Sequence, residues 1–356
     1  MSKLFEPISV RNLTTRNRIW IPPMCQYSCH NKDGIVNTWH VVHYGEWAVG
    51  GAGMIIAEAT AVTPIGRISP WCAGIWSEDH AKAWSVVVNA VHELGGKIGI
   101  QLAHAGRKGS SNSDWSGTGT VGELGGGWQT VSSTDRPFEH YEAPRRLETE
   151  ELSNVVHEFV NAANLAVSAD FDLLEIHAAH GYLLHQFLSP LTNDRTDIYG
   201  GSLENRARLL LEVVIAVRAN VGDDLPIAVR FSASDWTEGG WTQEETATVA
   251  QWCLDAGADF FDISSGGIIG TATIPWGPNY QVPFAEHVGE KVDAPVSAVG
   301  MITTATQAED ILEKGIVDVV MIGRAALGDP YWPLRAAKEL GVELDYKPKQ
   351  LGRALI

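Results

Sequence analysis

The segment His177-Ala-Ala-His180-Gly-Tyr182 carries two imidazoles and a phenol just after an apolar run. Paired neutral imidazoles can donate hydrogen bonds to a carbonyl oxygen or an oxyanion, and Tyr182 can supply a proton. The two histidines can instead bind a metal ion, which would make the protein a metal-dependent hydrolase or lyase, but no acidic cluster accompanies them. A third interpretation is that both rings are buried and hydrogen-bonded without a ligand.

Cys25 lies in a second segment of this kind, Pro22-Pro-Met-Cys-Gln-Tyr-Ser28. The spacing of Cys25, Cys29 and His30 does not match a usual zinc site. An isolated cysteine is commonly a buried apolar side chain. At the end of a strand, however, its polarisable thiol can touch a redox cofactor.

Two polar side chains interrupt apolar runs: Arg230 in Ile227-Ala-Val-Arg-Phe231 and Gln101 in Ile98-Gly-Ile-Gln-Leu102. A buried guanidinium is costly unless it faces an anion, and a ring that becomes anionic on reduction is a suitable partner. The amide of Gln101 can pair with the donor and acceptor edge of a heterocycle. The alternative is a polar interior layer without a ligand. On the expected strand Phe260–Ser264 and just before it, Asp262 and Asp259 are as readily structural as functional.

Glycines follow the last two apolar runs, in Val299-Gly300-Met301 and Ile322-Gly323-Arg324. Glycines at such places make tight turns, or they expose backbone N–H groups that cradle a phosphate. Arg324 adds a planar, permanently charged group suited to phosphate oxygens. The combination favours a phosphate site, which belongs to a substrate or to a cofactor.

The elements that must position these residues alternate between short apolar runs and longer amphipathic segments. We expect strands at Arg18–Pro22, Gly53–Glu58, Lys97–His104, Asp172–His177, Pro226–Phe231, Phe260–Ser264, Pro295–Gly300 and Val317–Gly323. We expect helices at His40–Gly50, Glu78–Leu94, Glu150–Ser168, Leu203–Val221, Gln243–Ala256, Phe284–Val292, Ala305–Lys314 and Tyr331–Leu340. Continuous apolar runs are typical of parallel strands covered on both faces.

This alternation predicts an α/β protein with a (β/α)8 TIM barrel, formed as a single domain over residues 1–356. A doubly wound open sheet is the rival, but no Gly-x-Gly-x-x-Gly follows the first strand. Long insertions follow strand three (105–147, a lid or a hairpin) and strand four (178–202). The candidate residues stand after the expected strands, at the end of a barrel where active sites lie. Histidines on the expected helices are assigned no role: His40, His43, His80, His92, His157 and His287.

The charge balance excludes several functions. With 26 Lys and Arg against 43 Asp and Glu, the formal net charge is −17, which disfavours nucleic acid and anionic membrane surfaces as partners. No apolar run reaches the roughly 18 residues of a membrane span, and the start lacks a signal-peptide core. Four cysteines cannot form the framework of a secreted small domain, so reduced thiols and a cytoplasmic location are expected.

The motifs above resemble those of the Old Yellow Enzyme family of FMN-dependent ene-reductases, in particular its thermophilic-like class. They span almost the whole chain in order. The matching segments are Pro22-Pro-Met-Cys-Gln-Tyr-Ser28, Ile100-Gln-Leu-Ala-His-Ala-Gly-Arg-Lys108, His177-Ala-Ala-His-Gly-Tyr-Leu-Leu-His-Gln-Phe-Leu-Ser-Pro190, 193–206, Pro283-Phe-Ala-Glu286 and Ile322-Gly-Arg324.

The resemblance implies FMN as cofactor and NADPH or NADH as reductant. The residues it assigns to the cofactor are Pro22, Pro23, Met24, Cys25, Ala59, Gln101, Arg230, Gly300, Gly323 and Arg324. Within this set Cys25 would tune the flavin potential, Arg230 would stabilise the reduced ring, and the last three residues would hold the phosphate.

The resemblance also implies ping-pong reduction of the C=C bond of α,β-unsaturated carbonyl compounds. The catalytic residues it implies are Tyr182, His177, His180 and Cys25. His177 and His180 would bind the carbonyl oxygen, Tyr182 would donate the proton, and Tyr27 would help to bind the substrate. Lys108 would lie near the pocket mouth.

The C-terminal segment departs from the family pattern. Where this class often has Pro-x-Gln-Tyr-x-Arg, the chain reads Pro348-Lys-Gln-Leu-Gly-Arg353, so Leu351 replaces the tyrosine. We expect a homodimer or homotetramer in which the tail, 342–356, reaches a neighbouring active site and Arg353 contacts its substrate. Within the barrel enzymes, a dienoyl-thioester reductase is the nearest rival, but such proteins usually append further cofactor domains. A catalytically silent binding barrel is a third class.

Overall fold

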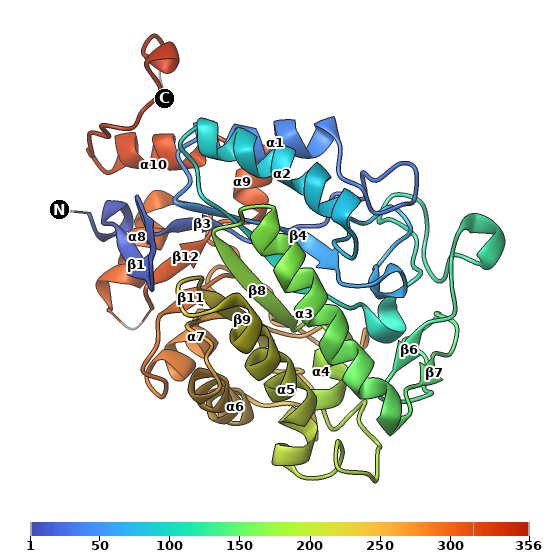
Figure 1. Ribbon diagram of the computed structural model, residues 1–356. Coiled ribbons are helices and arrows are strands. Elements are labelled where there is room, and N and C mark those ends of the chain that lie inside the picture. The colour runs from blue at the N-terminus through green and yellow to red at the C-terminus, as the bar shows by residue number, and fades with distance from the viewer. Residues whose placement is uncertain (1, 316, 355–356) are drawn as a thin grey trace.

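Eight parallel strands close into a barrel surrounded by helices in the computed structural model, which describes residues 2–315 and 317–354 (Figure 1). The barrel strands are β3 (Ile19–Ile21), β4 (Met54–Ala61), β5 (Ile98–Ala103), β8 (Leu173–Ala178), β9 (Ile227–Ser232), β10 (Phe260–Ser264), β11 (Val296–Ala298) and β12 (Val319–Met321). Each pairs with its neighbour in chain order, and β12 pairs with β3 to close the ring. The predicted (β/α)8 fold is confirmed, and every expected strand is present.

Helices cover the outside of the barrel, which explains why the strands are apolar without alternation. All residues of β4, β5, β8, β9 and β10 are buried. The helices of the eight units are α1 (Thr38–Val49), α2 (Glu78–Glu93), α3 (Leu152–Ser168), α5 (Leu203–Val221), α6 (Gln243–Asp255), α7 (Val282–Gly289), α8 (Ala305–Glu313) and α10 (Trp332–Glu339). Each overlaps an expected helix, with ends that differ by up to three residues.

A hairpin that the sequence did not predict closes the amino end of the barrel. It consists of β1 (Ile8–Val10) and β2 (Leu13–Thr15), which pair antiparallel. Its apolar side chains pack on inward residues at the strand starts, where the rings of Trp20 and Phe260 stack with their centroids 4.7 Å apart. Because this end is filled with apolar side chains, only the carboxyl end is free to hold a polar site.

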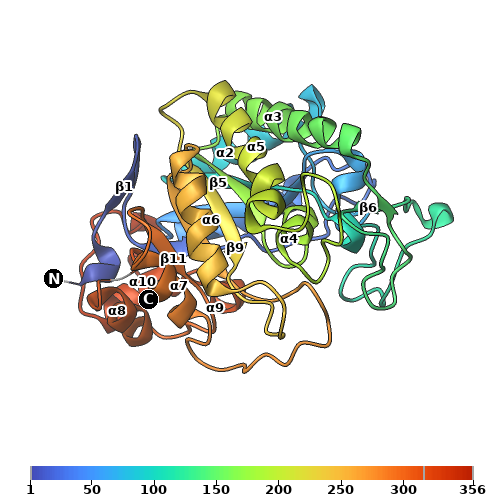
Figure 2. The same cartoon turned by 90° about the horizontal axis from the view of Figure 1, so that it is seen from below.

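The two insertions lie together at the same side of the barrel (Figure 2). Residues 105–147 hold two short strands that pair parallel, β6 (Val131–Ser132) and β7 (Arg145–Arg146). The second insertion contains an unpredicted helix, α4 (Leu183–Leu188). Hydrogen bonds of 2.8 and 2.9 Å run from the Ser132 and Ser133 hydroxyls to the side-chain and backbone oxygens of Gln186 in α4.

Within the described residues, the remaining short elements are one α-helix and six 3-10 helices. They are α9 (Arg324–Gly328), η1 (Lys3–Phe5), η2 (Pro64–Gly66), η3 (Gly106–Lys108), η4 (Glu123–Gly125), η5 (Thr149–Glu151) and η6 (Lys349–Leu351). Across the described residues, no helix has the length and apolar character that spanning a bilayer requires.

Candidate active site

The loop after β8 brings both histidines and Tyr182 together at the carboxyl end. The imidazole centroids of His177 and His180 lie 5.3 Å apart, and the His177 ring lies 5.0 Å from the Tyr182 ring. The loop turns sharply here because His180 and Gly181 both adopt positive φ, +57° and +75°. Three side chains that can donate a proton or a hydrogen bond therefore surround one small volume.

Burial fixes the protonation of these groups. Desolvation, followed by the charge of Arg230, lowers the pKa of His177 and of His180 well below the ordinary histidine value. Both rings are therefore neutral near pH 7. His177 Nδ1 accepts the Ala179 N–H at 3.3 Å, so its proton is on Nε2. Burial also raises the pKa of Tyr182, which keeps its phenol protonated.

The segment after β3 places Cys25 and Tyr27 beside Tyr182. These three side chains pack against one small buried cluster, Ala59, Ile68, Cys72, Ala103 and Ala105. Burial, followed by the neighbouring Cys25, raises the pKa of Tyr27, so this phenol is also neutral. Cys72 touches Cys25 and was missed in the sequence because its own segment has no other chemical signal. All four cysteines are free.

A buried glutamate anchors the Cys25 segment. The Glu58 carboxylate accepts the Gln26 N–H at 3.0 Å and the Tyr44 hydroxyl at 3.3 Å, and it lies 3.3 Å from His40 Nε2. His40 Nδ1 accepts the Asn37 N–H at the start of α1, so Nε2 carries the proton. His40 was assigned no role from the sequence, where helical position alone indicated packing. Its contact with Glu58 became visible only with the fold.

Charged and amide side chains form a polar layer inside the barrel, between the apolar amino end and the site. Arg230 Nε lies 2.8 Å from Asp262 Oδ2, and Asp262 also accepts the Ser297 hydroxyl at 2.8 Å. Gln101 donates to Glu175 Oε1 at 2.7 Å. The guanidinium therefore has a carboxylate partner within the protein, which the sequence left undecided. Burial, followed by Asp262, raises the pKa of Glu175 to about 8.

The two glycines and Arg324 meet at one cavity of about 540 Å³. Arg230 and Ser264 line the same cavity, so it extends from the polar layer to the ends of β11 and β12. If this cavity binds a phosphate, the cationic side chain that lines it should not already be paired with a carboxylate of the protein. No carboxylate of residues 2–315 and 317–354 pairs with Arg324, whose guanidinium lies 5.9 Å from the Trp276 ring. The set fits a flavin nucleotide with a phosphate tail.

The cavity and the histidine loop are parts of one site. His180 Nε2 and the Ser264 hydroxyl are 2.7 Å apart, and Ser264 lines the cavity. On the other side, a Cβ built at Gly323 would lie 3.5 Å from Pro22 and 3.7 Å from the Met24 sulfur. Pro23 lies half-buried between these two residues. Apart from Gln101 and Arg230, which lie in the polar layer below, and Arg353, the predicted site residues therefore gather at the carboxyl end of the barrel.

The insertion 105–147 reaches this mouth. The Trp115 ring meets the Tyr27 ring edge to face at 5.5 Å, and Lys108 Nζ lies 5.1 Å from the Tyr182 ring centroid. Burial, followed by Arg107, lowers the pKa of Lys108 to about 8. Trp115 was missed because an exposed loop tryptophan carries no positional signal.

Arg353 does not join these residues in its own chain. It is exposed on the C-terminal tail, which extends away from the barrel beyond α10 (Figure 1).

The histidine pair lacks the further ligands that a metal centre needs. No group of three or more His, Cys, Asp or Glu side chains among the described residues is placed to hold a metal ion. The metal-dependent hydrolase or lyase is therefore not favoured.

Fold and site together define a barrel oxidoreductase that holds a flavin nucleotide. The sequence profile of the NADH:flavin oxidoreductase / NADH oxidase family matches residues 3–343, and the chain belongs to this family. It is an NAD(P)H-dependent flavin oxidoreductase with FMN as its cofactor, as the family resemblance implied.

Individual relatives agree with this assignment. An NADPH dehydrogenase of Geobacillus thermodenitrificans (strain NG80-2) is 46% identical over 343 residues, covering 96% of each chain. Morphinone reductase in complex with tetrahydroNAD superposes with a TM-score of 0.80 at 29% identity, over 98% of this chain and 94% of that one. An Old Yellow Enzyme homologue from Zymomonas mobilis superposes with a TM-score of 0.80 at 28% identity, over 96% of this chain and 94% of that one. The resemblance to the Old Yellow Enzyme family is confirmed.

Proposed function

We propose that the protein is an ene-reductase, which uses NADPH to reduce the activated C=C bond of α,β-unsaturated carbonyl compounds. The observation that carries this proposal is the convergence of two neutral imidazoles and a protonated phenol around one volume beside the cofactor cavity. When bound, FMN supplies hydride transfer between the nicotinamide and the substrate.

The residues around the cavity would hold FMN in distinct ways. Gly300, Gly323 and Arg324 would bind the phosphate. Arg230 would face the ring, with Gln101 at its polar edge. Side chains after β3 and in β4 would line the ring's apolar surroundings: Pro22, Pro23, Met24, Cys25 and Ala59. This assignment is supported by the shared cavity and by the contact of the β3 segment with Gly323.

The two imidazoles would bind the substrate's carbonyl oxygen. His177 Nε2 bears a proton because Nδ1 accepts a backbone N–H. The Ser264 hydroxyl lies 2.7 Å from His180 Nε2 and 3.2 Å from Gln281 Oε1, and it has one proton for the two acceptors. We propose that His180 binds substrate in the tautomer that accepts this proton at Nε2, which leaves Nδ1–H as a second donor. Hydrogen bonds that strengthen as negative charge develops on the oxygen withdraw electrons from the β-carbon and activate it for hydride addition.

Tyr182 would donate the proton to the α-carbon. The phenol is held beside His177 and stays protonated. Tyr27, which packs against the same small cluster as Tyr182, would contact the substrate. Because one pocket would bind the nicotinamide and the enone in turn, we expect ping-pong kinetics.

A two-step anaerobic experiment tests the proposal. NADPH should bleach the flavin of the purified protein, and 2-cyclohexenone should then restore its absorbance. Reoxidation by oxygen but not by any enone, quinone or nitroalkene tried would contradict the proposed substrate class.

The variant Tyr182→Phe removes only the phenol hydroxyl. General acid catalysis contributes about 10²- to 10⁴-fold, so we expect enone-driven reoxidation to slow by about 10²-fold or more. Flavin reduction by NADPH needs no proton from this group and should stay near the wild-type rate in stopped-flow measurements. Tyr199→Phe, on a buried loop tyrosine whose hydroxyl donates to Glu212, serves as control. Equal reoxidation rates for Tyr182→Phe and wild type would remove Tyr182 from the mechanism.

We also propose that the chain forms a homodimer or homotetramer in which the tail, 342–356, brings Arg353 to a neighbouring active site. The proposal is supported by the exposure of Arg353 and of its neighbours Gly352 and Ala354. Deleting residues 350–356 should raise the KM for the enone several-fold and leave FMN binding unchanged. Steady-state kinetics that do not change on deletion would contradict it.

A further inference from the structure

The backbone of His180 is fixed by side chains from two other elements. Its N–H donates to Ser232 Oγ at 2.9 Å, and its carbonyl accepts from Lys108 Nζ at 2.8 Å. The residue has a φ of +57°, which a non-glycine residue adopts only when its surroundings enforce it. The orientation of the His180 ring therefore depends on how firmly this turn is held.

The next residue, Gly181, is held in the same way. Its N–H donates to His185 Nδ1 at 2.9 Å, and its carbonyl accepts from Gln186 Nε2 at 2.7 Å. A Cβ at this position would lie 2.1 Å from the Gly267 carbonyl oxygen, so no other residue fits. All four backbone polar groups of the dipeptide His180-Gly181 are thus bonded to side chains.

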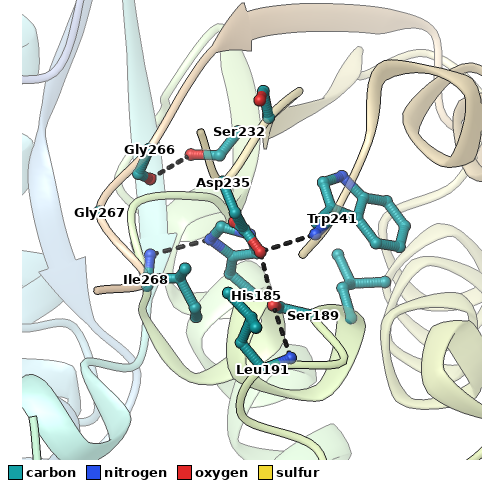
Figure 3. Close-up of polar contacts among 12 residues, drawn as sticks. His185, Ser189, Leu191, Ser232, Asp235, Trp241, Gly266, Gly267 and Ile268 are labelled. Atoms are coloured by element: carbon teal, nitrogen blue, oxygen red, sulfur yellow. Dashed lines mark hydrogen bonds and ion pairs between the residues drawn. The ribbon is translucent and has the colours of Figure 1, made fainter. Parts of the chain in front are cut away.

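His185 holds Gly181 only in one tautomer. Because Nδ1 accepts the Gly181 N–H, it carries no proton, and the proton is on Nε2. Nε2 faces Asp235 Oδ1 at 3.1 Å, and both side chains are fully buried. Figure 3 shows this pair at the centre of a buried polar cluster.

Asp235 is arranged as a fixed acceptor. Its Oδ2 accepts the Ser189 hydroxyl at 2.6 Å and the Trp241 N–H at 2.7 Å (Figure 3). Burial alone would raise the pKa of this carboxyl, but the contacts with His185, Ser189 and the Trp241 N–H lower it below its usual value. The carboxylate stays ionised and can only accept, so it keeps the His185 proton on Nε2.

We infer that His185 and Asp235 are positioning residues for the reaction, which fix the turn at Gly181 and through it the placement of His180 and Tyr182. This inference rests on the proposed function of those two side chains. Neither His185 nor Asp235 touches the site itself. Their effect passes through one hydrogen bond, from the Gly181 backbone to His185 Nδ1.

The isosteric variant Asp235→Asn tests this chain of contacts. The Trp241 N–H can only donate, so the asparagine oxygen should take the Oδ2 position and its NH2 group should face His185. His185 must then accept at Nε2 and carry its proton on Nδ1, where it meets the Gly181 N–H. Two donors would face each other, and the turn would lose its support without any change in side-chain volume.

We expect three results for Asp235→Asn. Nitrogen-15 NMR of histidine-labelled protein should show the His185 proton moving from Nε2 to Nδ1. Enone-driven reoxidation should slow by about 10- to 100-fold, as small misplacements of catalytic groups cause. FMN affinity should not change, because the cluster does not line the cofactor cavity. A moved proton with wild-type reoxidation, or a proton that stays on Nε2, would overturn the inference.

Ser189→Ala is the matched control. It removes a bond to the same carboxylate but leaves the Trp241 N–H on Oδ2 and the His185 tautomer intact. Its reoxidation rate should stay within about twofold of wild type. An equal loss in both variants would mean that the cluster only stabilises the fold, and would overturn the positioning role.

If Asp235→Asn does not fold, His185→Gln takes its place. Its amide can still donate toward Asp235 but places no acceptor at the Gly181 N–H, so the same slow reoxidation is expected. Wild-type rates in that variant would count against the inference. Failure of the proposed function looks different, since the wild-type protein itself would then reduce no enone while the NMR result would still stand.

Discussion

Replacing His177 and His180 together by alanine should lower kcat/KM for 2-cyclohexenone by about 10³-fold or more. Removing a single donor to a developing oxyanion costs about 10²- to 10³-fold in well-studied enzymes, and this variant removes both proposed donors. Burial and the charge of Arg230 keep both rings neutral, so each would act on the carbonyl oxygen through a hydrogen bond and not through a positive charge.

The measurement is enone-driven reoxidation of the reduced flavin in single turnover, with FMN content checked by absorbance. Each single variant should show part of the loss. His157→Ala, an exposed histidine on α3, is the control and should behave as wild type. Reoxidation by the double variant within about threefold of wild type would show that the imidazoles do not bind the carbonyl.

Arg324→Ala should weaken FMN binding by about 10- to 100-fold. Hydrogen bonds to charged groups contribute about 1.5–3 kcal/mol, and about 1.4 kcal/mol is tenfold in Kd. The guanidinium stands at a cavity with Gly300 and Gly323 and has no carboxylate partner among the described residues, so its charge is available to a phosphate.

Riboflavin, which lacks the phosphate, isolates this contact. Flavin-fluorescence titrations of the apoprotein should show weaker FMN binding by Arg324→Ala but the same riboflavin affinity as wild type. Arg335→Ala removes an equal charge from α10, where Arg335 pairs with Asp329, and should change neither affinity. An equal loss for FMN and riboflavin would show that Arg324 contacts the ring system or only supports the loop.

The residues that would react with the substrate can be recognised in the sequence, but the residues around His185 that hold their backbone cannot. Tyr182 and the two imidazoles are visible in the sequence as a motif. The side chains that hold their backbone are scattered over the first insertion, α4 and the end of β9. Only the closed barrel brings these elements together.

The sequence by itself determined the barrel and the composition of its mouth. Apolar runs and amphipathic segments are local patterns, and in a barrel all strand ends meet at one rim, so residues such as Cys25, His177 and Gly323 could be assigned to a common site from their positions. The hairpin under the barrel was not predictable in this way, because its strands are three residues each and become strands by packing on Trp20 and its neighbours.

Only the tertiary structure decided which polar groups pair. Asp262 as the partner of Arg230, His40 as a neighbour of Glu58 and the tautomer of His185 each depend on contacts between side chains remote in the chain. Hydrogen bonds and buried ion pairs are short and directional, so they are fixed by strand register and helix placement rather than by residue type. Periodicity in the sequence carries information about burial, but it carries none about which buried donor meets which acceptor.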